Sequence, residues 1–166
     1  MVLHDDLYLD IADLIFHHRW AALVTSTKEL PSVSMVAYAT DAREMGLLLF
    51  LSQLAPHTRQ LIKNPVCCLG VSQGDDGVVD PQTLSRISLN GQVSRVARDD
   101  SRFDEWKQVY CKRLPASERL FGFADFSLFL FRPEHGRYVG GFGQAHNLTT
   151  QQISECFQCA QRLANE

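Results

Sequence analysis

Residues 50–65, FLSQLAPHTRQLIKNP, carry an extended segment directly into a short helix. Pro56 suits the first turn of a helix, and Asn64-Pro65 ends that helix after about two turns. The free backbone N–H groups of the first turn point back toward the strand end. Hydroxyl, imidazole and guanidinium groups gather there, from Ser52, Thr58, His57 and Arg59. The junction therefore predicts a phosphate monoester site, and the alternative is a strand cap beside a solvated helix face.

The segments around this junction show the period of two that is typical of strands, separated by short turn signals. Gly91 interrupts the longest of these runs and predicts a bulge or bend. Helices are expected over 5–18, 99–114 and 149–165, and Thr149 and Gln152 have the spacing of a capping box at the start of the last one. Strands are expected over 20–27, 32–40, 46–52, 66–72 and 85–97, and a hairpin over 124–133 and 135–143 that turns at Pro133-Glu134. The fold class is thus α+β and mainly antiparallel β, a barrel with flanking helices in a single domain over 1–166.

Composition and charge restrict the classes of partner. The chain has 166 residues, 45% of them hydrophobic, and a formal net charge of −3, so no global field attracts nucleic acid or an anionic membrane. No apolar run approaches the ~20 residues that span a bilayer, and the N-terminus lacks the pattern of a signal peptide. We expect a cytoplasmic protein that binds neither nucleic acid nor membranes.

The five cysteines lack the regular spacing of a disulfide framework and are expected to be reduced thiols. Cys156 and Cys159 have CxxC spacing, but they lie inside a helical pattern. No second CxxC or histidine pair accompanies them, so no zinc site is expected. The motifs GxGxxG, GxxxxGK[ST], HExxH and GxSxG are missing from the sequence, which leaves the enzyme classes that use them without support.

Three blocks of sequence resemble one known family. The first is S-x-L-x-x-H-T at residues 52–58 followed by Asn64-Pro65, and the second is PSVSMVAY at 31–38. The third is Asp125-Phe126 followed by GGFGQA at 140–145. Together they resemble the FMN-binding split-barrel family that includes pyridoxamine 5′-phosphate oxidase, and more narrowly its branch of HugZ-type haem-utilisation proteins.

This resemblance implies a six-stranded split barrel that forms a homodimer, with two ligand sites shared between the subunits. It also implies FMN as cofactor and a flavin-dependent oxidoreductase of unknown substrate as the first functional hypothesis. The junction residues would bind the FMN phosphate, and the strand over 33–36 would edge the isoalloxazine. The cofactor-binding residues expected on this basis are Val33, Ser34, Met35, Val36, Ser52, His57, Thr58, Arg59 and Gln92.

The chain departs from the oxidase in ways that bear on activity. Val33 and Tyr38 stand where the oxidase carries basic residues, and the chain finishes in a helical pattern instead of the oxidase's substrate-binding strand. Oxidation of pyridoxamine phosphate is therefore not expected, and whether the protein is an enzyme stays open.

The alternative hypothesis is a haem-binding protein for storage, transfer or oxidative cleavage of haem on the same dimer. Haem ligation needs a neutral imidazole nitrogen at an apolar pocket. His146, directly after GGFGQA, is the candidate iron ligand, with Asp125 as its hydrogen-bond partner. A solvated loop histidine is the competing interpretation of His146.

Overall fold

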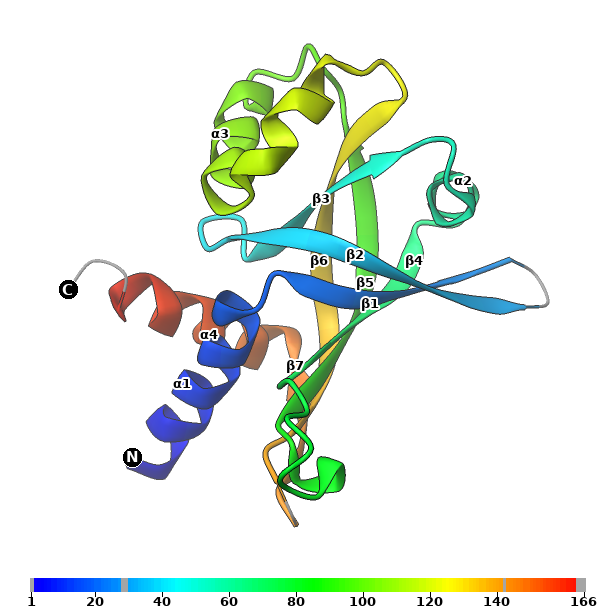
Figure 1. Ribbon diagram of the computed structural model, residues 1–166. Helices are drawn as coiled ribbons and strands as arrows, with labels where there is room; N and C mark the ends of the chain where they lie inside the picture. Colours follow the sequence, from blue (N-terminus) through cyan, green and yellow to red (C-terminus); the bar gives the residue numbers. More distant parts are fainter. Residues whose placement is uncertain (1, 28–29, 142, 164–166) are drawn as a thin grey trace.

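The computed structural model describes residues 2–27, 30–141 and 143–163, and shows a closed antiparallel barrel (Figure 1). The strand order is β3-β2-β1-β4-β5-β6-β7, and pairing of β3 with β6 closes a ring of six strands, with β7 as an extra edge strand. The predicted six-stranded barrel is confirmed. The strands are β1 (Trp20–Ser26), β2 (Pro31–Asp41), β3 (Gly46–Ser52), β4 (Val66–Ser72), β5 (Arg86–Val96), β6 (Phe126–Val139) and β7 (Ala145–Thr149). The helices are α1 (Val2–His17), α2 (Pro56–Lys63), α3 (Phe103–Arg113) and α4 (Thr150–Leu163), with 3₁₀ segments η1 (Pro81–Thr83) and η2 (Pro115–Gly122).

Two hydrophobic cores account for the fully apolar sequence of β3. Leu47, Leu49 and Leu51 belong to the core that fills the barrel, together with residues of α1 and α4. Leu48 and Phe50 belong to a second core, formed with residues of α3 and η2. Because both faces of β3 are covered, the strand cannot alternate apolar and polar residues as a half-exposed strand does.

Helices α1 and α4 contact each other and cover one side of the barrel (Figure 1). Ile11 and Ile15 of α1 and Phe157 of α4 are fully buried in the barrel core. The predicted capping box of α4 is confirmed, since the Thr149 amide donates to Gln152 Oε1 at 3.0 Å and the Gln152 amide donates to Thr149 Oγ1 at 3.3 Å. This cap fixes where the chain passes from β7 into α4.

The prediction of a hairpin turn at Pro133-Glu134 is wrong. The chain continues through these residues as one long strand, β6, and turns instead between Val139 and Ala145. Pro133 lies opposite Gly91, where the β5–β6 register shifts, so the proline occupies a bulge that needs no regular ladder donor. A Cβ atom on Gly91 would lie 2.0 Å from the carbonyl oxygen of Arg132, so the bulge predicted at Gly91 is confirmed and requires glycine.

Within the described residues, no helix combines the length and the apolar character needed to cross a membrane.

Candidate ligand-binding site at the junction of β3 and α2

The junction between β3 and α2 is held by hydrogen bonds to the start of β6. Ser52 Oγ donates to Asp125 Oδ2 at 2.6 Å and accepts from the Leu54 amide at 3.2 Å. The Gln53 amide donates to the Asp125 carbonyl at 2.7 Å, and its side chain donates to Ser127 Oγ at 3.1 Å. The hydroxyl of Ser52 is therefore already engaged within the protein.

Arg59 and Thr58 also have structural surroundings. The Arg59 guanidinium donates to the carbonyl of Leu54 at 2.8 Å, which secures the first turn of α2 and leaves the remaining N–H groups exposed. Thr58 is fully buried, and its Oγ1 has no hydrogen-bond partner among the described residues. Thr58 thus packs into the interior.

His57 is half-buried, and burial lowers the pKa of its imidazole because desolvation disfavours the charged form. At neutral pH the ring is therefore uncharged. A neutral imidazole contributes little to holding a phosphate dianion, but it is the form that binds iron. The structure places the four predicted junction residues close together, with Ser52 engaged, Thr58 buried and Arg59 exposed.

The predicted β2 residues divide between the two faces of the strand. Val33 and Met35 point outward and are 68% and 49% exposed, whereas Val36 is buried and Ser34 is intermediate. β2 pairs with β3 only from Tyr38 onward, so the edge of β2 beside the junction has no strand partner among the described residues.

Gln92 lies on β5 opposite Val66, the first residue after the α2 connection. Its side-chain amide donates to Glu134 Oε1 at 3.0 Å. Gln92 is exposed and near the end of α2, but its side chain is engaged with β6.

His146 and Asp125 lie at opposite ends of β6. His146 on β7 pairs with Tyr138, whereas Asp125 directly precedes Phe126. Phe126 and Tyr138 are twelve residues apart on β6, which corresponds to roughly 40 Å along a strand. Within one chain the structure therefore does not bring Asp125 to His146.

The surroundings of His146 are polar and acidic. The residue lines a cavity of about 970 Å³ between β7 and α1. Exposed Asp6 and Asp10 of α1 line the same cavity, together with Gln144 and Asn147. The two carboxylates in this cavity repel anionic groups of a ligand.

Large apolar side chains of β1, β2 and β4 are exposed together on the outer face of the sheet, an arrangement that was not predicted from the sequence. Trp20, Val33, Met35 and Val66 are 49–68% exposed, and Val24 lies directly between Val33 and Cys68 in the sheet. The sequence of β4, VCCLGVS, is nearly apolar on both faces, and this pattern could have indicated an apolar outer surface. We call these six residues the apolar outer face.

The cysteine pair is inside a helix, as predicted. Cys156 is fully buried in α4, and burial raises the pKa of its thiol to about 12. Among the described residues, no group of three or more histidine, cysteine, aspartate or glutamate side chains is arranged to hold a metal ion. Phe142 of the GGFGQA block lies outside the described residues.

Comparison with known proteins gives a consistent result. The sequence pattern of the CREG β-barrel family matches residues 12–155. The chain is 33% identical over 132 residues to the chloroplast haem oxygenase HOZ of Arabidopsis thaliana, covering 78% of this chain and 38% of that protein. It is 25% identical over 127 residues to the haem oxygenase HutZ of Vibrio cholerae, covering 72% of this chain and 67% of that protein. This chain therefore spans well under half the length of the Arabidopsis relative.

A solved structure shares the fold. The haem-binding protein from Mycobacterium smegmatis superposes with a TM-score of 0.79 at 22% identity, covering 89% of this chain and 60% of that chain. Together with the family match and the two sequence relatives, this fold confirms the resemblance to the haem-utilisation branch of the split-barrel family.

The expectation of an FMN-dependent oxidoreductase is wrong. Both sequence relatives are named haem oxygenases, and the structural neighbour is a haem-binding protein. The junction agrees with this correction, because its hydroxyls are engaged or buried and its histidine is neutral.

Proposed function

Since the chain belongs to the CREG β-barrel family, we propose that it binds haem and acts in haem utilisation. The observation that supports this most is the 33% identity to a haem oxygenase over 78% of the chain. The requirements of haem can be compared with the described residues: a neutral imidazole for the iron, an apolar surface for the macrocycle and cations for the two carboxylates.

His57 meets the first requirement better than His17, His18 and His146. His17 pairs with Asp13 at 2.6 Å, and the His18 ring lies 2.9 Å from the Leu14 carbonyl. His146 lies beside carboxylates in a polar cavity. His57 has a pKa lowered by burial and makes no hydrogen bond with the described residues, so we assign it as the iron ligand and His146 as the second candidate.

The surroundings of α2 supply the other two requirements. Leu54 and Ile62 are 74% and 52% exposed around this helix and offer apolar area. Arg59 and Lys63 line a hollow of about 400 Å³ on α2 together with Ile62. A haem whose ring lies on the apolar side chains would find two cations for its carboxylates within one helix.

The proposal includes a homodimer formed through the apolar outer face. Large apolar side chains gathered on one sheet face are typical of an interface, because isolated chains rarely leave such patches uncovered. Val33→Asp combined with Met35→Asp should convert the dimer to a monomer, as measured by analytical ultracentrifugation. Ile62→Asp on α2 is the matched control. A monomeric wild type would refute this part of the proposal.

Oxidative cleavage of haem is a second candidate function, favoured by the names of the two sequence relatives. In such a reaction dioxygen oxidises the macrocycle, and an external electron donor supplies the reducing equivalents that the reaction also consumes. Ascorbate added to the haem complex in air, with catalase present, should bleach the Soret band if the protein cleaves haem. A persistent band would leave storage or transfer as the function.

Titration with haemin tests the main proposal. We expect a saturable Soret band that differs from free haemin and fits a stoichiometric complex, with no quenching of FMN fluorescence in a parallel titration. A spectrum that equals the sum of protein and free haemin at all ratios would refute haem binding.

A further inference from the structure

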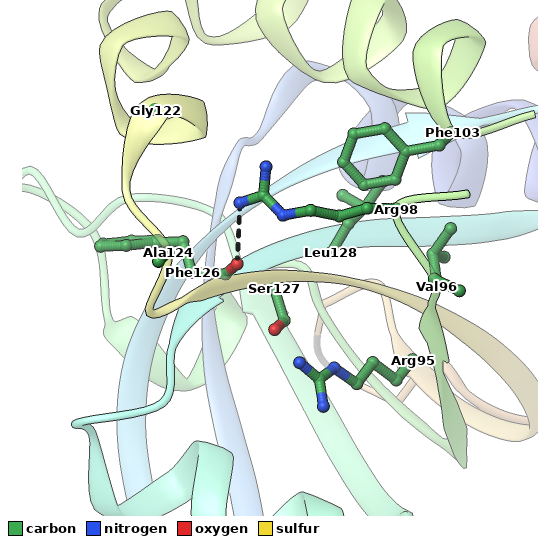
Figure 2. Close-up of a pocket in the computed structure, with 10 residues that line it drawn as sticks. Arg95, Val96, Arg98, Phe103, Gly122, Ala124, Phe126, Ser127 and Leu128 are labelled. Carbon is green, nitrogen blue, oxygen red and sulfur yellow. Dashed lines mark hydrogen bonds between the residues drawn. The ribbon is translucent and has the colours of Figure 1, made fainter. Parts of the chain in front are cut away.

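A second hollow lies where β5 and β6 separate. The last register pair that joins them is Val96 with Leu128. Beyond this pair the chain leads from the end of β5 to α3, and from η2 to the start of β6. A cavity of about 740 Å³ lies between these two segments (Figure 2). We call it the β5–β6 hollow; it is lined chiefly by Arg95, Val96, Arg98, Phe103, Phe126 and Ser127.

The hollow is basic in a protein whose formal net charge is −3. Its lining includes two arginines and no carboxylate. Arg98 donates to the carbonyls of Phe121 at 3.2 Å and Phe123 at 3.0 Å, so its charge is fixed at the wall. Arg95 is exposed and makes no hydrogen bond or ion pair with the described residues, so its guanidinium is free to bind an anion.

Ser127 supplies a second donor beside Arg95. Its side chain is buried, with 6% of the residue exposed, and its Oγ accepts a hydrogen bond from Gln53 at 3.1 Å. The hydroxyl proton has no acceptor among the described residues. Figure 2 shows the Ser127 hydroxyl and the Arg95 guanidinium on the same side of β6, directed toward one another. A carboxylate placed between them would receive hydrogen bonds from both groups.

The rest of the hollow is apolar. Val96 and Leu128 are buried, and Phe103 and Phe126 contribute aromatic surface. The volume is in the range typical of small-molecule sites, roughly 300–1,000 Å³. Inorganic anions would gain nothing from these walls, whereas an aromatic or branched hydrocarbon group would.

We propose that the β5–β6 hollow binds a small organic acid, with its carboxylate on Arg95 and Ser127 and its hydrocarbon part against Phe103 and Phe126. The inference does not rest on haem binding, because it uses none of the residues assigned to haem. The hollow is nevertheless connected to the β3–α2 junction through the hydrogen bond between Gln53 and Ser127.

Isothermal titration with 4-phenylbutanoate and its neutral analogue 4-phenylbutan-1-ol tests the proposal on the full chain. The acid should bind wild type at least about tenfold more tightly than the alcohol, as expected for one charge-assisted contact. Arg95→Ala should remove this preference, and Arg95→Lys should retain part of it. Arg119→Ala is the matched control, since Arg119 is also exposed and lies outside the hollow.

Three outcomes would overturn the proposal. The first is the absence of acid binding to wild type. The second is equal affinity of wild type and Arg95→Ala for the acid. The third is an equal loss in Arg119→Ala, which would indicate attraction by surface charge in general. A preference for the acid that depends on Arg95 and survives Arg119→Ala supports it.

Discussion

The two ends of β6 place a histidine in opposite chemical settings. At the first end, Asp125 is bound by Ser52 and Gln53, and half-buried His57 in the first turn of α2 has a pKa lowered by burial. At the other end, His146 lies in a polar cavity with Asp6 and Asp10. The comparison teaches that an imidazole becomes a candidate iron ligand through its surroundings, which a sequence motif alone does not specify.

The largest expected effect is on haemin affinity, and it tests directly whether His57 and His146 differ as iron ligands. His57→Ala should lower haemin affinity by at least about a hundredfold, because loss of a group that only hydrogen-bonds to a metal ligand already costs roughly 10–100-fold in metal affinity. His146→Ala should leave the affinity within about twofold. Haemin titration followed at the Soret band measures both. If His146→Ala caused the larger loss of affinity, His146 and not His57 would be the iron ligand.

The carboxylates at the two ends should also differ in their effect on stability. Asp125→Ala removes a charge-assisted hydrogen bond at 2.6 Å and should lower the free energy of unfolding by about 1.5–3 kcal/mol. Asp10→Ala, at an exposed position beside His146, should change it by less than about 0.5 kcal/mol. Urea unfolding of the two variants is the measurement. Equal losses would show that the junction is no more ordered than the β7 end.

Two buried threonines near the junction of β3 and α2 should differ in their contribution to stability. Thr25 donates to Gln60 Oε1, whereas Thr58 Oγ1 has no partner among the described residues. Thr25→Val should destabilise the protein by about 1 kcal/mol, and Thr58→Val should be neutral or stabilising, since a methyl group replaces an unpaired buried hydroxyl. Thermal or urea unfolding compares the pair. A loss in Thr58→Val as large as in Thr25→Val would indicate an unseen partner such as water.

The smallest effect is the dependence of stability on pH at His57. Its pKa is lowered in the folded state, so the unfolded state binds the proton more tightly. Stability should therefore be unaffected by this group above the unfolded pKa of about 6.5 and should fall as pH decreases below it. His57→Gln should flatten the change in Tm between pH 7.5 and 5. An unchanged slope would mean that the imidazole is as solvated as in the unfolded chain.

Much of the fold follows from local sequence patterns. The alternation in β1, β2 and β5 and the apolar run of β3 place strands correctly, and Thr149 with Gln152 predicts the start of α4. The turn predicted at Pro133 is wrong although a proline normally ends a strand. β6 tolerates Pro133 because Gly91 lies opposite it on β5, and this relation appears only once the strands are paired.

The candidate site was less predictable, for a physical reason. The sequence places Ser52, His57, Thr58 and Arg59 together, but their free hydrogen-bonding capacity depends on distant residues. Ser52 is engaged by Asp125, which is 73 residues away. Burial of Thr58 and His57 likewise results from tertiary packing. Local residue type indicates which groups are present, whereas packing decides which of them are available to a ligand.

The pairing of β3 with β6 also has a consequence for how the chain folds during synthesis. Residues 47–52 find their partners at 126–131, so the barrel cannot close until most of the chain has left the ribosome. Until then β3, which is almost entirely buried in the finished protein, presents an unpaired apolar edge. Contacts this distant in sequence form slowly because a long loop must first be closed. The nascent chain is therefore expected to depend on chaperones during the interval between the synthesis of β3 and that of β6.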